Sequence, residues 1–158
     1  MATIDEFSAL WDQMLEDDTI WKGAVDLTSD KLIEVNQQQL LDGKSNTGDF
    51  LPQYKSFLMP NGEQYGTFKQ KKNPRNGGRW DMDLTGNSFS TMKAQFVGDR
   101  HVISGEGHAG AFNRGTLGKG KVKGKLFGVY ENDYLKVYRE KYLYPLQVAL
   151  IKAYTGAQ

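Results

Sequence analysis

The chain has no cysteine, and only two of its 158 residues are histidine. The absence of cysteine excludes a disulfide framework, thiolate catalysis and any zinc site built on sulfur ligands. Chains without disulfides are typical of reducing compartments. We therefore expect this protein in a reducing cell interior, or in a particle assembled there.

Long apolar runs and an excess of charge of either sign are also lacking. No run approaches the roughly 18 apolar residues that span a bilayer, and the N-terminus Met-Ala-Thr-Ile-Asp-Glu is acidic, unlike a secretory signal. The formal net charge is +1, so no global charge favours nucleic acid or an anionic membrane. We expect no membrane association, and the length predicts a single domain over residues 1–158.

Residues 1–18 predict an amphipathic N-terminal helix. Thr3 and Glu6 have the spacing of a capping box, in which each side chain satisfies a backbone N–H of the other residue. Apolar residues at spacings of three and four then share one face: Ile4, Phe7, Leu10, Trp11, Met14 and Leu15. This stripe predicts core packing, with docking on another subunit as the alternative.

The pattern between residues 19 and 42 is weaker. We expect a short extended piece over 31–35 and a helical turn over 37–41, which ends where Gly43 supplies a left-handed cap.

A long polar stretch rich in turn formers occupies residues 43–80. It carries interleaved aromatic side chains, which a disordered linker rarely does: Phe50, Tyr54, Phe57, Tyr65 and Phe68. The stretch predicts a long ordered loop. Loops beyond about 12 to 15 residues are usually functional, so the five aromatics are candidate contacts with a neighbouring subunit.

Residues 84–126 predict a β-hairpin region. Apolar and polar residues alternate from Ser88 to Phe96, and a second extended run, His101 to Ser104, follows the Gly98-Asp99 turn. The fold class expected from these segments is α+β, with a small antiparallel sheet flanked by an N-terminal and a C-terminal helix and a long ordered aromatic loop.

The segment from Gly105 to Lys125 contains seven glycines and five lysine or arginine residues. Its last lysines alternate with other residues, so in an extended chain they point the same way: Lys119, Lys121, Lys123 and Lys125. Such a row protects a sheet edge from pairing with other chains, or contacts DNA or an acidic partner surface.

The C-terminal helix is expected over residues 132–155. Asn132 is its candidate N-cap, Pro145 predicts a kink or restart, and Gly156 ends it. Four tyrosines exceed what one helix face can bury, which predicts that some face a neighbour: Tyr134, Tyr138, Tyr142 and Tyr144.

Two glycine motifs fail as nucleotide sites. Gly105 to Gly110 matches G-x-G-x-x-G, but no helix is expected at its third glycine and no acidic residue follows at the required distance. Gly115 to Lys121 matches G-x-x-x-x-G-K, yet Val122 replaces the Ser or Thr that binds magnesium. We expect no cofactor.

Enzymatic signals are weak. Asp81 and Asp83 with His101 or His108 would suit a divalent ion in a small nuclease, but paired carboxylates before a turn more often cap backbone donors or face solvent. The chain has no G-x-S-x-G elbow. We expect a protein without enzymatic activity, with a metal-dependent nuclease and a DNA-binding accessory protein as alternatives.

A series of short motifs runs through roughly residues 33–152: Gln39 to Gly43, Thr47-Gly48, Leu51 to Tyr54, Tyr65 to Lys69, Asn73-Pro74, Asp83 to Gly86 with Phe89, and Leu126 to Val129. In this order they resemble small neck proteins of tailed bacteriophages, the tail-completion or virion-morphogenesis group at the head-to-tail junction. The segment from Gly105 to Lys125 departs from the short hairpin usual in that family.

The resemblance implies a structural virion protein, assembled in the host cytoplasm as a ring of identical subunits between portal or adaptor proteins and tail proteins. Ring contacts are head-to-tail, so each subunit presents two different faces. The aromatic loop and the surplus tyrosines would be covered by the next subunit. Lysines 119–125 would line the lumen and meet packaged DNA through its phosphates, without reading its sequence.

Overall fold

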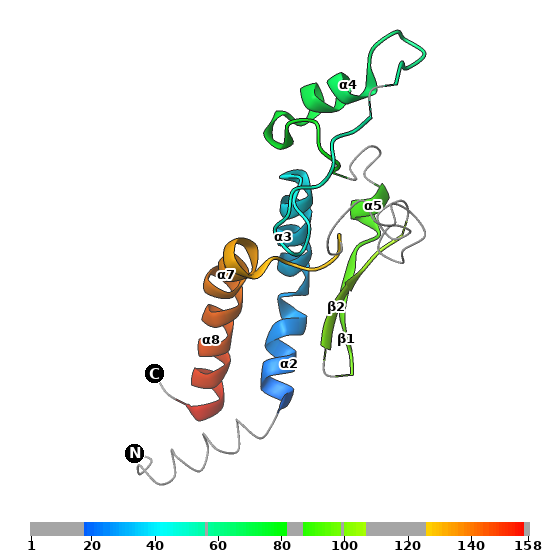
Figure 1. The fold of residues 1–158 in the computed structure, drawn as a ribbon. Helices are drawn as coiled ribbons and strands as arrows, with labels where there is room; N and C mark the ends of the chain where they lie inside the picture. Colours follow the sequence, from blue (N-terminus) through cyan, green and yellow to red (C-terminus); the bar gives the residue numbers. More distant parts are fainter. Residues whose placement is uncertain (1–17, 56, 82–86, 99, 107–125, 157–158) are drawn as a thin grey trace.

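The computed structural model describes residues 18–55, 57–81, 87–98, 100–106 and 126–156 (Figure 1). The predicted N-terminal helix lies outside these residues except for its last position. The predicted lysine row at Lys119, Lys121, Lys123 and Lys125 also lies outside them. Of the helices described, none is long and apolar enough to cross a membrane.

Two consecutive helices, α2 (Asp18–Leu27) and α3 (Ser29–Leu41), form a rod through the middle of the molecule (Figure 1). They are joined at Thr28, whose hydroxyl donates to the Ala24 carbonyl at 2.8 Å. The extended piece predicted over residues 31–35 is therefore wrong, because these residues lie inside α3. The predicted end is confirmed, since Gly43 has the left-handed φ of +69°.

Helix α3 could not be predicted from its hydrophobic pattern, because two residues on its buried side are polar. Asn36 and Gln39 are both fully buried. Their side-chain amides donate to the Gly128 carbonyl at 2.9 and 3.0 Å, and the Tyr130 N–H donates to the Gln39 side chain at 2.7 Å. Their partners are about 90 residues away in the chain, so the helical period of the buried side becomes visible only in the fold.

The sheet is a two-stranded antiparallel hairpin of β1 (Lys93–Val97) and β2 (Arg100–Ser104), with Ala94 opposite Ile103. The predicted hairpin is confirmed, but its first strand starts later than expected. Ser88 belongs to a short helix, α5 (Asn87–Ser90), and the Met92 N–H donates to the Phe89 carbonyl in the turn that follows. Alternation of residue types over 88–92 therefore does not mark a strand.

The C-terminal helix runs from Glu131 to Thr155 and contains two π-helical parts. Its segments are η2 (Glu131–Leu135), α7 (Lys136–Tyr138), η3 (Arg139–Leu143) and α8 (Tyr144–Thr155). The helix changes from π-helical to α-helical geometry at Tyr144, next to Pro145, where a kink or restart was predicted. The predicted cap is wrong: Asn132 lies inside η2 and Tyr130 precedes it. Gly156 ends the helix as predicted.

The elements form three layers around one core. The α2–α3 rod lies between the hairpin on one side and the C-terminal helix on the other (Figure 1). Hydrophobic side chains from all three layers are buried together: Ala24, Leu32, Leu40, Leu51, Met92, Ile103, Leu126, Phe127, Tyr138 and Leu143. The fold is thus a small α+β fold with an antiparallel sheet and flanking helices, in agreement with the sequence prediction.

Residues 50–81, which we name the α4 lobe, project beyond the end of α3 (Figure 1). The lobe contains α4 (Tyr65–Lys72) and the 3-10 turn η1 (Pro74–Asn76). The predicted long loop is therefore ordered but partly helical. The turn formers on both sides of α4 dominate the sequence pattern and hide a helix of only eight residues.

Candidate interaction surfaces

Four of the five predicted contact aromatics meet in the α4 lobe, around the ring of Tyr65. Phe57 stacks on this ring with a centroid distance of 4.7 Å, and Tyr54 meets it edge-on at 5.1 Å. Phe68 completes the cluster at 6.2 Å. Phe57 is 56% exposed and its neighbour Leu58 is 72% exposed. The cluster therefore stabilises the lobe and still leaves apolar side chains exposed.

The fifth predicted aromatic, Phe50, lies apart from this cluster. Its side chain is exposed, and the guanidinium of Arg79 stands 4.4 Å from the centre of its ring. A cation over an aromatic face is stabilising, so Phe50 is covered on one side by a charged residue of the same lobe.

An ion pair buried inside the lobe was not predicted from the sequence. Lys69 Nζ lies 2.7 Å from Asp81 Oδ1, and both side chains are almost completely buried. The Tyr54 hydroxyl also donates to Asp81 Oδ1, at 3.2 Å, and the Asn73 amide donates to Oδ2 at 3.4 Å. Burial and the nearby Asp81 charge raise the pKa of the Tyr54 hydroxyl above its ordinary value. The ion pair and the two hydrogen bonds to Asp81 connect α4 to the last residue of the lobe.

The predicted metal alternative gains no support from the described residues. Asp81 is engaged by Lys69, and no group of three potential ligands occurs in the part of the chain that the structure describes. His101 lies on β2, where its Nε2 atom is 3.1 Å from the Ser29 hydroxyl. Asp83 and His108 lie outside the described residues.

The outer surface of the lobe is basic. Residues 50–81 contain six lysine or arginine residues and two acidic residues, a formal charge of +4. Lys55, Lys71, Lys72 and Arg75 are exposed. Of these, Lys71 forms an ion pair with Glu63 at 2.7 Å. The lobe therefore combines exposed apolar side chains with positive charge.

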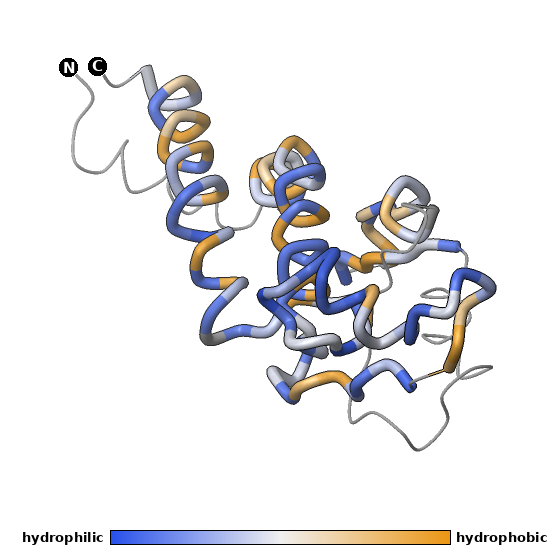
Figure 2. Tube along the Cα trace, turned by 90° about the horizontal axis from the view of Figure 1, so that it is seen from above, coloured by the Kyte–Doolittle hydropathy of each residue, from blue (hydrophilic) through white to orange (hydrophobic). Residues whose placement is uncertain are grey.

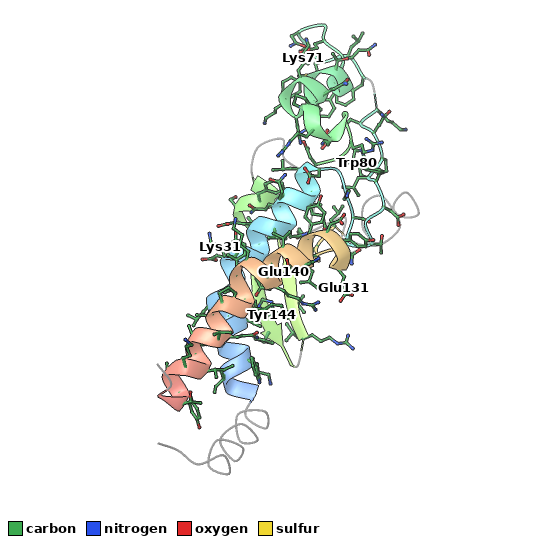
Figure 3. All side chains as sticks on the ribbon, turned by 90° about the vertical axis from the view of Figure 1, so that its left-hand side faces the viewer. Lys31, Lys71, Trp80, Glu131, Glu140 and Tyr144 are labelled. Atoms are coloured by element: carbon green, nitrogen blue, oxygen red, sulfur yellow. The ribbon has the colours of Figure 1, made fainter. Side chains whose placement is uncertain are left out.

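A second surface of different chemistry lies on α8, near the other end of the molecule. Figure 3 labels Lys71 on the lobe and Tyr144 on the C-terminal helix. The 12 residues of α8 include a single charged side chain, Lys152, yet none of them is buried. Apolar positions occur along successive turns of this helix (Figure 2). Tyr144 and Val148 lie one turn apart and are both about half exposed. A helix that is apolar on most sides is normally covered.

The four tyrosines predicted as surplus have different environments. Tyr138 is buried and shares a 2.6 Å hydrogen bond with Thr28. The Tyr134 hydroxyl donates to Asp42 at 2.6 Å, and Tyr142 is half-buried beside Lys31. Tyr144 is exposed. The sequence predicts surplus tyrosines, but only the fold separates the exposed ring from those that bind within the chain.

An open apolar groove of about 330 Å³ lies between α2 and the end of α8. It is lined by Ile20, Gly23, Leu27, Leu150, Ala153 and Tyr154. Leu27 is 71% exposed and Tyr154 is also exposed. This groove could not be predicted from the sequence, because its two walls are more than 120 residues apart in the chain.

Comparison with known proteins adds no relative: no family model, no curated protein and no solved structure matches the chain. The structure is that of a small α+β protein with exposed apolar side chains on the α4 lobe and on α8.

Proposed function

We propose that the chain is a structural subunit that assembles head-to-tail with identical copies, as in the neck of a tailed bacteriophage. One observation carries this proposal. Among the described residues, ten hydrophobic residues are buried and ten large hydrophobic residues are exposed. Exposed apolar surface that gathers in patches is typical of interaction sites rather than of a finished monomer surface.

The difference between the two surfaces favours head-to-tail contact. The α4 lobe offers Phe57 and Leu58 among basic residues, whereas α8 offers Tyr144 and Val148 on a nearly uncharged helix. A two-fold symmetric dimer uses the same patch on both subunits, but a head-to-tail contact needs two different patches. Such contacts continue from copy to copy and give a ring if the rotation closes.

The resemblance to phage neck proteins is the reason for proposing a ring at the head-to-tail junction as the particular assembly. Two motifs that carry this resemblance meet in the fold, because Gln39 binds the Gly128 carbonyl. In the Thr47-Gly48 motif, Gly48 has a φ of +81°, and an added Cβ atom would lie 2.7 Å from the Tyr130 ring. These motif residues thus have structural roles at the junction of the lobe and the helices, which is consistent with a shared architecture.

In this assembly the partners are identical subunits, flanked by portal or adaptor proteins and by tail proteins, within the virion. The lysine row Lys119, Lys121, Lys123 and Lys125 would contact packaged DNA through phosphates. Replacing the four lysines with glutamine should then reduce DNA retention in assembled particles without preventing ring formation. Unchanged retention would remove the DNA contact from the proposal and leave the ring intact.

The assembly itself is tested by mass. Light scattering across a concentration series should show association of the wild-type chain, and Phe57→Ser with Leu58→Ser should weaken this association at least tenfold, because hot-spot apolar side chains contribute about 2 kcal/mol or more each. Val97→Ser on the hairpin is the matched control, since Val97 is 58% exposed but lies on neither surface. The proposal would be contradicted if a label attached to the chain appeared away from the neck in particle micrographs. It would also be contradicted if the chain remained a monomer at all concentrations.

A further inference from the structure

The charges of the α4 lobe divide into a neutral part and a basic part. Each acidic residue of the lobe pairs with a lysine at 2.7 Å, Asp81 with Lys69 inside the lobe and Glu63 with Lys71 on its surface. The formal charge of +4 therefore belongs to the four basic residues outside these two pairs: Lys55, Lys72, Arg75 and Arg79.

Three of these residues lie where the two ends of the lobe run side by side. Gln53 and Arg79 form an antiparallel bridge, which puts their side chains next to each other. Lys55 is two residues from Gln53, the spacing that shares one side of an extended chain. Arg75 is exposed on η1, which leads into Arg79. Within the described residues, none of the three cations forms an ion pair with a carboxylate.

The guanidinium of Arg79 is held in a defined position. Its Nη1 atom donates to the Asn76 carbonyl at 3.1 Å, and its carbon atom lies 4.4 Å from the centre of the Phe50 ring. A Cβ atom added at Gly43 would lie 3.0 Å from Arg79 Cβ, and one added at Gly77 would lie 3.2 Å from Nη1. The two glycines therefore leave the space that Arg79 occupies. A guanidinium has five N–H donors, so an arginine held in this way keeps donors for a phosphate group.

Phe50 adds an aromatic surface to this group of cations. Its side chain is 62% exposed, although the guanidinium of Arg79 stands over the ring. Proteins that bind single-stranded nucleic acid combine basic residues along the backbone with aromatic rings on which bases stack. In a duplex the bases are already stacked on each other, so a surface phenylalanine gains little from them.

We propose that Phe50, Lys55, Arg75 and Arg79 form a binding site for single-stranded nucleic acid. The three cations contact backbone phosphates, and one base stacks on Phe50. The site is separate from the head-to-tail contact, because Phe57 and Leu58 belong to a different hairpin, closed by the bridge between residues 58 and 64. The inference therefore holds or fails independently of the proposed assembly.

Fluorescence anisotropy with labelled oligonucleotides tests the site on the full chain. The probes are a DNA strand, an RNA strand and a DNA duplex, each of about 12 nucleotides or base pairs, which is within the usual size of such sites. At least one single strand should bind about fivefold or more tightly than the duplex, the weaker limit of one stacked base. The tighter of the two strands identifies the nucleic acid. Between about 50 and 200 mM salt, three phosphate contacts predict a slope of log K against log salt of about −2.

Two variants separate the phosphate contacts from the stacking. Lys55→Gln with Arg75→Gln changes only exposed residues, and it should weaken binding and reduce the slope to about −0.7. Phe50→Leu keeps an apolar side chain, and it should weaken binding at least about fivefold without changing the slope.

Matched controls lie on other elements. Lys93→Gln with Arg100→Gln removes the same two charge types from exposed positions of the hairpin, and Tyr154→Leu removes an exposed ring from α8. Both should leave binding within about twofold, because the salt-dependent contacts and the stacking are assigned to the lobe. Losses in the controls equal to those in the site variants would overturn the proposal. It would also be overturned if no probe bound, or if the duplex bound as tightly as either strand.

Discussion

The ion pair between Lys69 and Asp81 gives a quantitative test of how the α4 lobe is held. The two charged atoms lie 2.7 Å apart, and the side chains are 1% and 2% exposed. At an effective dielectric constant of about 20, the attraction is about 6 kcal/mol. Desolvation of two charges offsets much of this, but removal of one partner leaves the other charge buried, and that costs about 3 to 5 kcal/mol.

The appropriate change is Asp81→Asn, which keeps the shape and an acceptor for the Tyr54 hydroxyl but removes the negative charge. We expect a loss of about 3 kcal/mol or more, a large fraction of the stability of a typical domain. The double change Lys69→Met with Asp81→Asn removes both charges and should recover most of this loss, because no buried charge remains unpaired.

Urea denaturation of the wild type, the two single variants Lys69→Met and Asp81→Asn, and the double variant measures the coupling energy between the two residues. Hydrogen exchange of residues 57–72 shows whether the loss of stability is local to the lobe. Lys31 and Glu34 are the matched control. They have the same 2.7 Å separation but are 45% and 54% exposed, so Glu34→Gln should cost less than about 0.5 kcal/mol. If Asp81→Asn costs no more than this control, the reasoning from burial is refuted.

Three further predictions concern the body of the molecule. Tyr138→Phe should cost about 1 kcal/mol in chemical denaturation, because it removes the buried 2.6 Å hydrogen bond with Thr28; no loss would show that this bond is not stabilising. Gly48→Ala should cost about 2 kcal/mol or more, since the residue has a φ of +81° and faces an aromatic ring, whereas Gly62→Ala, with a φ of +80° and open space, should cost less; equal losses would leave backbone strain as the sole cause. Burial lowers the pKa of His101, so the unfolded chain binds its proton more readily and stability should fall as the pH drops below about 6.5. His101→Gln should flatten this part of the curve of unfolding free energy against pH, and an unchanged curve would contradict the assignment.

Features that depend on local chemistry were predictable from the sequence. Gly43 and Gly156 end helices as expected, because few residues other than glycine adopt a left-handed φ without strain. The change of helix geometry next to Pro145 and the hairpin over residues 93–104 also follow from properties of neighbouring residues. These signals act within a few positions of the chain, so they need no knowledge of the fold.

Features that depend on distant partners were not predictable. Asn36 and Gln39 interrupt the apolar pattern of α3, and their burial makes sense only beside the Gly128 carbonyl. Lysine is normally exposed. Lys69 is buried because it forms an ion pair with Asp81, which follows it in the chain beyond η1. The groove also joins α2 to the far end of the chain. In each case the sequence around one residue does not indicate which distant residue will contact it.

The most direct test of head-to-tail assembly uses two complementary variants. One variant carries Phe57→Ser and Leu58→Ser in the lobe, and the other carries Tyr144→Ser and Val148→Ser on α8, so each keeps one intact surface. Sedimentation velocity should find each variant monomeric alone and a 1:1 dimer when they are mixed, because the intact α8 of one meets the intact lobe of the other. A mixture that stays monomeric, or variants that associate like the wild type, would contradict the account.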